Sequence, residues 1–84
     1  MIFINISVDL NVEKVEFQQK IGFRLKKIRS ELGLSQRQLA LNANKDPQSL
    51  ERVENGKSCP TVFFLNEICV ALNISLADFF KDFE

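Results

Sequence analysis

Apolar residues recur along much of this chain at the three- and four-residue intervals of helices. Five of them, separated by four, four, three and four residues, predict one long amphipathic helix from about residue 13 or 16 to residue 32. They are Phe17, Ile21, Leu25, Ile28 and Leu32. Gly33 follows directly and is suited to a C-terminal cap, so we expect the helix to end there.

Residues 35–57 read as two short helices joined by a tight turn. Ser35 is an N-cap residue, and Gln38 stands three positions later, as in a capping box. Asn44 falls in a polar stretch and tolerates a positive φ, which predicts the turn. Asp46 is expected to cap a second helix that begins at Pro47 and stops at Asn55-Gly56. The positions expected to be buried are Leu39, Ala40, Ala43, Leu50 and Val53.

Two further helices follow. Pro60 is a natural helix starter, and we expect a helix over about residues 61–72. Its predicted buried positions are Val62, Leu65, Ile68, Cys69 and Leu72. Ser75 then caps a last short helix, in which Leu76, Phe79 and Phe80 close the core.

The N-terminal segment has a different pattern. Apolar and polar residues alternate from residue 4 to residue 13, which predicts a β-strand. A lone strand leaves its backbone groups unpaired, so a partner is expected from a second copy of the chain. An extended arm laid on the helices and a disordered tail are the alternatives. We therefore divide the chain into residues 1–13, a strand or arm, and residues 14–84, a helix-turn-helix domain.

One set of linked positions extends beyond the helix-turn-helix caps. It comprises Ser35-Gln36, Leu39-Ala40, Ala43, Leu50, Arg52 and Glu54-Asn55-Gly56-Lys57, preceded by Leu32-Gly33-Leu34 and followed by Pro60. With these residues, the sequence from about residue 21 to residue 80 resembles the Xre and Cro family of phage-type repressors. The resemblance implies an all-α, five-helix DNA-binding domain of the phage-repressor type. It also implies an ion pair between Arg29 and Glu54 that pins the first helix to the end of the third. The sequence departs from the family pattern at Asn44, Lys45 and Pro47.

Composition narrows the possible functions. A chain of 84 residues has room for one domain, and without His or Trp it has few residues for metal or general-base chemistry. Cys59 and Cys69 lack metal-ligand spacing and are expected to be free thiols of a cytoplasmic protein. The N-terminus reads as neither a signal peptide nor a membrane span. We therefore expect no enzyme activity, no metal or cofactor, no small-molecule substrate and no membrane partner.

The net charge of zero conceals a strong asymmetry along the chain. Residues 20–57 carry nine basic and four acidic side chains, whereas the remainder carries two basic and seven acidic ones. Such polarity suits a protein with one face toward phosphates and another turned away. For the lysines of the first helix, a solvated helical surface of mixed charge is the alternative.

The helix-turn-helix geometry assigns roles to polar side chains, because its second helix enters the major groove with its first residues against the bases. Gln48 and Ser49 are expected to read bases, and Arg52 to reach guanine or a phosphate. Glu51 is acidic, and three interpretations of it stay open: it accepts a hydrogen bond from cytosine, it pairs with Arg37, or it faces solvent. The residues expected to contact phosphates are Gln36, Arg37, Lys45, Asn55 and Lys57.

Several apolar residues exceed what the core needs. Phe63, Phe64, Val70 and Phe83, with the apolar side of the N-terminal strand at Ile4, Ile6 and Val8, are expected to form a dimer surface. The alternative is that they cover one another within one chain. Our interpretation is a homodimeric, sequence-specific repressor of double-stranded DNA that reads a near-palindromic operator. An antitoxin, a restriction-modification controller and a protein-interaction module of the same fold with little DNA binding are the rivals.

Overall fold

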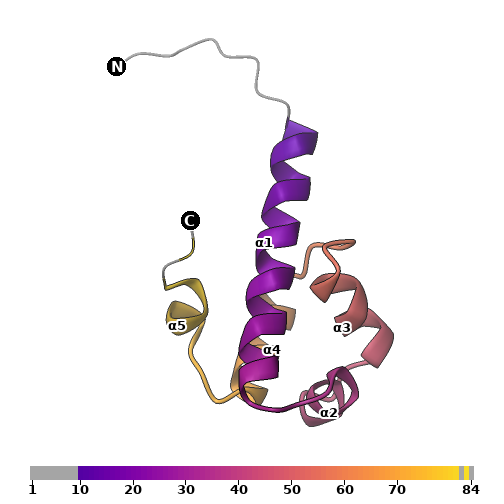
Figure 1. Ribbon diagram of the computed structural model, residues 1–84, viewed down its shortest axis with the longest axis vertical. Helices are drawn as coiled ribbons and strands as arrows, with labels where there is room; N and C mark the ends of the chain where they lie inside the picture. Colours follow the sequence, from indigo (N-terminus) through magenta and orange to yellow (C-terminus); the bar gives the residue numbers. More distant parts are fainter. Residues whose placement is uncertain (1–9, 82, 84) are drawn as a thin grey trace.

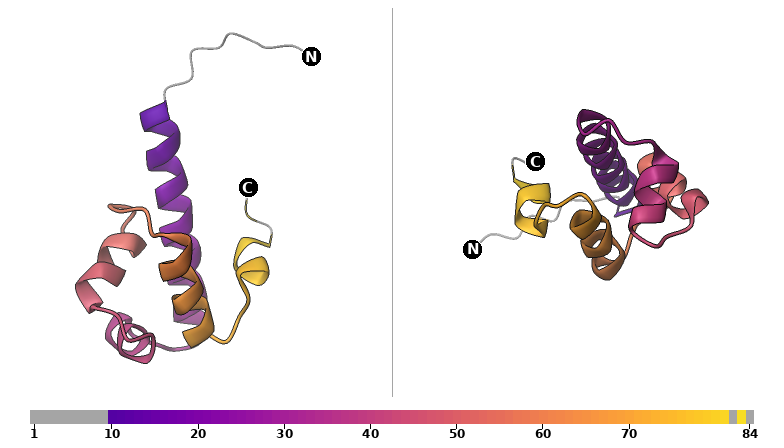
Figure 2. Two further views of the ribbon diagram at one scale, coloured as in Figure 1. Left: turned by 180° about the vertical axis from the view of Figure 1, so that it is seen from behind. Right: turned by 90° about the horizontal axis from the view of Figure 1, so that it is seen from below.

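The computed structural model describes residues 10–81 and Phe83, and helices make up the regular structure of this part of the chain (Figure 1). They are α1 (Leu10–Glu31), α2 (Gln36–Asn42), α3 (Pro47–Glu54), α4 (Val62–Ala71) and α5 (Leu76–Phe80). The predicted all-α class with five helices is confirmed. Figure 2 shows α2 and α3 on one side of α1 and α5 on the other, with α4 between them.

The first helix begins earlier than expected. Residues 10–13 are helical, so the strand predicted over residues 4–13 is wrong for its last four positions. Within a helix these residues satisfy their backbone groups locally, whereas a strand needs a partner. Residues 4–9 lie outside the described part of the chain. The division at residue 13 falls within a continuous helix.

Local capping follows the sequence closely at α2. The Ser35 hydroxyl accepts a hydrogen bond from the Gln38 N–H at 3.0 Å, and the Gln38 side chain accepts one from the Ser35 N–H at 2.8 Å. Asn44 has a φ of 57° in the turn, and Gly33 and Gly56 both adopt a φ of 72°. The predicted capping box, turn and glycine caps are therefore confirmed.

The cap of α3 differs from the prediction. Asp46 occupies the N-cap position, but its side chain makes no capping hydrogen bond. The Ser49 N–H, which such a cap would use, donates to the Asp46 backbone carbonyl at 3.0 Å. Pro47 is the first residue of the helix, as predicted.

All of the helices contribute to one core, formed by Ile21, Leu25, Ile28, Leu39, Ala40, Ala43, Leu50, Val53, Leu65, Ile68, Cys69, Leu72 and Phe79. Leu32 and Val62 were expected to be buried, but they are 53% and 73% exposed. Leu32 lies just beyond the end of α1, and Val62 is the first residue of α4, so both lie at helix ends outside the core. Phe17, also expected to be buried, is 44% exposed.

Candidate nucleic-acid interface

Helix α3 presents one apolar and one polar face. Leu50 and Val53 are buried, whereas Gln48 and Arg52 are exposed and Ser49 is half-buried. The three side chains expected to read bases thus lie on the outer side of α3 or at its edge. No described segment covers Gln48 or Arg52.

The end of α3 is held by a buried ion pair. Arg29 on α1 donates two hydrogen bonds to the Glu54 carboxylate, from Nε at 2.7 Å and from Nη2 at 2.9 Å. Arg29 Nη1 also donates to the Leu34 carbonyl at 2.6 Å. The Glu54 side chain is fully buried and that of Arg29 is 11% exposed. The ion pair implied by the family resemblance is therefore present.

The same carboxylate also binds Gln36 at the start of α2. Gln36 Nε2 donates to Glu54 Oε1 at 2.9 Å, so a single carboxylate connects α1, α2 and α3. This contact changes the interpretation of Gln36, which was expected to contact phosphate with its side chain. Its amide group is committed to Glu54, because that buried carboxylate has oxygen lone pairs left to satisfy.

Two contacts that sequence reasoning missed bring α1 and α3 close together. A Cβ atom at Gly22 would lie 2.5 Å from the carbonyl oxygens of Val53 and Glu54, so glycine lets the backbones approach. Gln18 Nε2 donates to the Gly56 carbonyl at 3.1 Å and holds the loop after α3. A glycine inside a helical pattern is costly and was the available sign of such close packing.

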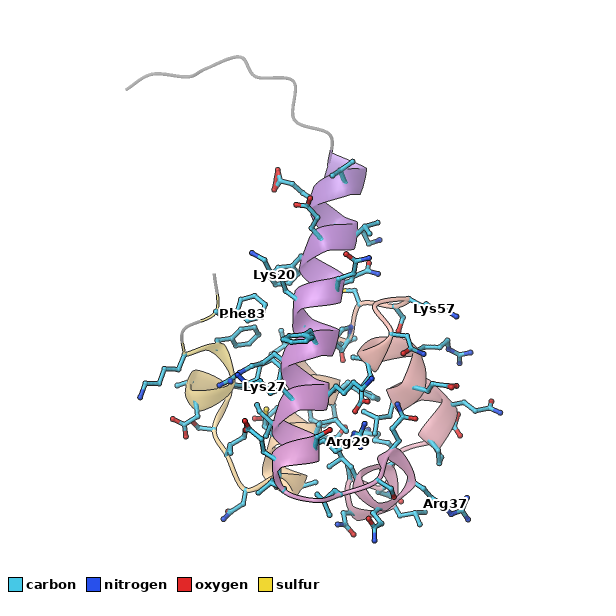
Figure 3. All side chains as sticks on the ribbon, viewed as in Figure 1. Lys20, Lys27, Arg29, Arg37, Lys57 and Phe83 are labelled. Atoms are coloured by element: carbon cyan, nitrogen blue, oxygen red, sulfur yellow. The ribbon has the colours of Figure 1, made fainter. Side chains whose placement is uncertain are left out.

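Three of the expected phosphate ligands are exposed: Arg37, Asn55 and Lys57. Arg37 lies at α2 and Lys57 follows α3, both on the side of the molecule that these two helices form (Figure 3). Lys45 is engaged elsewhere. Its ammonium group pairs with Glu67 on α4 and lies 5.4 Å from the centre of the Phe64 ring. Lys45 therefore links the turn to α4 through an ion pair and a cation–π contact.

Arg24, a further base of the positive segment, is also committed within the fold. Its Nε donates to the Phe79 carbonyl at 2.8 Å and its Nη2 to the Asp78 carbonyl at 3.0 Å. These bonds satisfy backbone groups of the short helix α5. Part of the positive charge in residues 20–57 therefore supports the fold.

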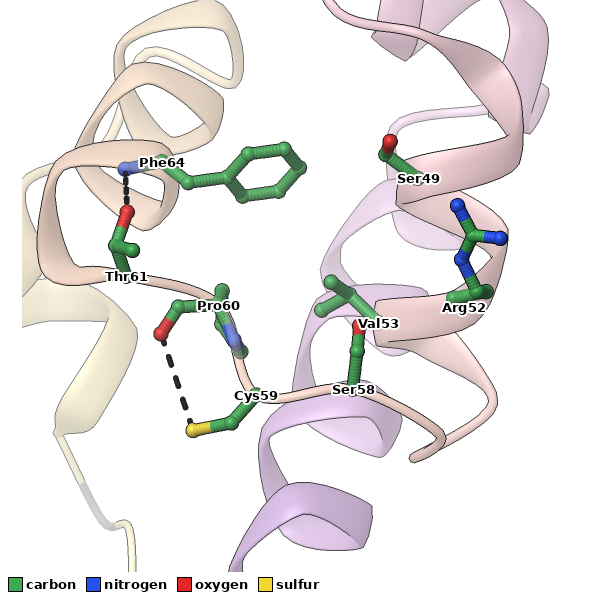
Figure 4. A pocket seen from close by; sticks show the side chains of 8 residues that line it. All are labelled: Ser49, Arg52, Val53, Ser58, Cys59, Pro60, Thr61 and Phe64. Carbon is green, nitrogen blue, oxygen red and sulfur yellow. Dashed lines mark hydrogen bonds between the residues drawn. The ribbon is translucent and has the colours of Figure 1, made fainter.

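A hollow of about 330 Å³ opens between α3 and the segment leading into α4 (Figure 4). Its lining residues are Ser49, Arg52, Val53, Ser58, Cys59, Pro60, Thr61 and Phe64. Ser49 and Arg52 thus border both this hollow and the outer face of α3.

Both cysteines are free thiols, Cys59 exposed and Cys69 buried, and burial raises the pKa of the Cys69 thiol to about 11. Across residues 10–81 and 83 we find no cluster of side chains able to hold a metal ion.

The expected dimer residues divide into four groups, and one of them is Phe64, which is half-buried and packs against the core. Phe63 and Val70 on α4 are 70% and 68% exposed. Phe83 packs inside the chain, with its ring centre 5.6 Å from that of Phe17 and 5.1 Å from that of Phe80. Ile4, Ile6 and Val8 lie outside the described residues.

The chain was also compared with models of known protein families. Residues 25–79 match the model of the HTH_3 helix-turn-helix family, which covers more than half of the chain and contains α2 and α3. The chain belongs to the HTH_3 family. The Xre-like resemblance drawn from the sequence is therefore confirmed.

Several solved HTH_3-like structures superpose on this chain. An HTH_3 family transcriptional regulator from Vibrio cholerae is 31% identical, with a TM-score of 0.78, over 83% of this chain and 39% of the other. The restriction-modification controller C.Esp1396I, solved as a tetramer in complex with its natural 35 base-pair operator, is 32% identical, with a TM-score of 0.74, over 79% and 87% of the two chains. The controller C.AhdI from Aeromonas hydrophila is 30% identical, with a TM-score of 0.73, over 75% and 96%.

This HTH_3 chain covers well under half of the length of the Vibrio cholerae regulator. No curated protein matches its sequence. None of the helices in the described part of the chain is both long and apolar enough to cross a membrane.

Proposed function

We propose that this HTH_3 protein is a homodimeric repressor that binds a near-palindromic operator in double-stranded DNA. The observation that carries the proposal is the setting of α3. Its outer face presents Gln48 and Arg52, while its end is held against α1 and α2 through the buried carboxylate of Glu54. A helix fixed in this way can enter a major groove without rearrangement.

Base reading is assigned to Gln48, Ser49 and Arg52. The amide of Gln48 can accept a hydrogen bond from adenine N6 and donate one to N7, and Arg52 can donate two to guanine. Ser49 lies at the edge of α3 beside the hollow, and we assign its short side chain a contact with a base edge. Arg37, Asn55 and Lys57 then contact phosphates on either side, and the N-terminus of α2 at Gln36 offers backbone N–H groups.

Dimerisation is assigned to α4. Phe63 and Val70 are seven residues apart, two helical turns, and therefore share one exposed face of that helix. Covering this face with the same face of a second copy removes both side chains from water. It also supplies the second recognition helix that a palindromic site requires, with half-sites about 34 Å apart.

The test compares two single substitutions by fluorescence anisotropy on a selected operator and on random duplex. Gln48→Ala is expected to weaken the operator complex by roughly 1–3 kcal/mol and to leave random duplex nearly unaffected. Lys57→Ala is expected to weaken both alike and to reduce the salt dependence. Lys81→Ala, an exposed lysine at the end of α5, is the matched control.

Two results would overturn the proposal. Equal losses on operator and random duplex for Gln48→Ala would remove it as a base reader. Failure of the wild-type protein to bind any duplex at low salt would instead favour a protein-interaction module of the same fold.

The two restriction-modification controllers among the similar structures favour one finer role. A controller of this kind is expected to bind an operator next to restriction-modification genes that neighbour its own. Gel shifts with the upstream DNA of the neighbouring genes test this role. Binding confined to the promoter of a neighbouring toxin gene would favour an antitoxin.

A further inference from the structure

Gln18 is a polar side chain buried on the inner face of α1. It is 8% exposed, although the residues on either side of it in the sequence are exposed. Ile21 and Leu25 are buried further along α1, at helical spacing from Gln18, so all three share one face of the helix. Burial of an amide group is unfavourable unless the group is hydrogen-bonded. Gln18 Nε2 meets this need by donating to the Gly56 carbonyl at 3.1 Å.

This hydrogen bond holds one side of a peptide group whose other side is already fixed. The Gly56 carbonyl and the Lys57 N–H belong to the same planar peptide group. The Lys57 N–H donates to the Arg52 carbonyl at 2.9 Å, which ties that side of the group to α3. No backbone N–H among the described residues donates to the Gly56 carbonyl. Gln18 therefore supplies, from α1, the contact that holds the carbonyl side.

Close packing brings this loop against α1. A Cβ atom at Gly56 would lie 2.9 Å from Gln19 Cγ and 3.2 Å from Gln19 Cα, so glycine is required for the approach as well as for its φ of 72°. Figures 1 and 2 show the loop after α3 beside α1. Glycine has wide backbone freedom, so packing alone does not fix the orientation of its carbonyl. The hydrogen bond from Gln18 selects one orientation.

We propose that Gln18 is a positioning residue that orients the Gly56–Lys57 peptide group for contact with a DNA phosphate. Lys57 is exposed, and Figure 3 shows its side chain extending away from α1. The inference rests on the proposed function, in which Lys57 contacts a phosphate. Because Gln18 is buried, it acts through Lys57 and not by touching DNA. Phosphate contacts carry no sequence information, so Gln18 is expected to affect all duplexes alike.

Gln18→Met tests this role, because methionine is similar in length and helix propensity but has no N–H to donate. By fluorescence anisotropy, we expect this variant to bind operator and random duplex roughly three- to ten-fold more weakly, with equal losses on both. The slope of log affinity against log salt concentration is expected to fall by up to about 0.9, the value for one phosphate contact. A loss of stability alone would leave this slope unchanged. Gln19→Met, at the exposed neighbouring glutamine, is the matched control and is expected to bind as wild type.

A double-mutant cycle tests whether Gln18 and Lys57 act together. If they do, Lys57→Ala is expected to change the affinity by less than about two-fold in a protein that already carries Gln18→Met. Gln18→Ser repeats the cycle with a side chain short enough to leave room for a water molecule at the Gly56 carbonyl, which protects the fold if Gln18→Met is unstable.

Amide hydrogen exchange tests the loop without DNA. In nuclear magnetic resonance spectra of the full chain, we expect the Lys57 amide to exchange at least about five-fold faster in Gln18→Met and Gln18→Ser than in wild type, because the loop opens more often. The Gln19→Met control is expected to exchange at the wild-type rate.

The outcomes separate this inference from the proposed function. An unchanged salt slope, unchanged Lys57 exchange, or a Lys57→Ala effect as large with Gln18→Met as without it would each overturn the role of Gln18 and leave the proposed function standing. A loss confined to the operator would also overturn that role, because it would indicate an effect on base reading. Wild-type protein that binds no duplex at low salt would overturn the proposed function and the role of Gln18 together.

Discussion

Replacing Arg29 with alanine leaves the carboxylate of Glu54 buried without its cation. Within the described residues, Gln36 then provides the one remaining side-chain hydrogen bond to that carboxylate. Breaking a buried pair by removing one partner typically costs about 3–5 kcal/mol. Solvent offers little relief here, because the Glu54 side chain is fully buried. We therefore expect Arg29→Ala to lower the free energy of unfolding by about 3–5 kcal/mol.

That loss is large for a domain of this size. A chain of 84 residues has a total stability of roughly 4–13 kcal/mol at typical values per residue. Urea denaturation followed by circular dichroism measures the change, with Lys14→Ala as the exposed control on the same helix. Arg29→Met/Glu54→Leu replaces both charges with apolar side chains and is expected to recover most of the loss.

A stabilising role for this buried ion pair is refuted if Arg29→Ala costs less than about 1 kcal/mol, the value typical of an exposed pair. It is also refuted if the double apolar variant is no more stable than Arg29→Ala. In either case the carboxylate would have another means of neutralisation, and the rigid placement of α3 would need a different explanation.

Three further predictions use the same denaturation assay. Gly22→Ala directs a methyl group at the Val53 and Glu54 carbonyl oxygens. We expect the free energy of unfolding to fall by about 1–3 kcal/mol, although alanine has the better helix propensity. An unchanged or higher stability would contradict the close approach of the two helices. Ser35→Ala removes the α2 cap and is expected to cost about 0.5–2 kcal/mol. Burial raises the pKa of the Cys69 thiol from 9.0 to about 11. Below pH 9 the thiol is therefore protonated in the folded and in the unfolded chain. Above pH 9 the unfolded chain ionises first, so stability falls by up to about 1.4 kcal/mol per pH unit until pH 11, and Cys69→Ala is expected to lack this component.

The local features of the helix-turn-helix could be predicted from the order of residues alone. The capping box of Ser35 and Gln38, the positive φ of Asn44 and Gly56, and the start of α3 at Pro47 depend on residues within a few positions of one another. Such features form from short-range hydrogen bonds and steric limits, which are readable in order along the chain. The ion pair of Arg29 with Glu54 spans 25 residues and was expected through the family resemblance alone.

Which of these side chains remain free to contact DNA or another chain depends on tertiary packing. Lys45 and Gln36 have side chains that can bind phosphate. In this fold Lys45 pairs with Glu67, and Gln36 donates a hydrogen bond to Glu54. Phe83 was expected to exceed the needs of the core, yet Phe17 and Phe80 pack against it. These outcomes depend on residues that are distant in sequence and brought close by packing. The type of a residue indicates which contacts its side chain can make. The packing of the helices determines which neighbour it contacts.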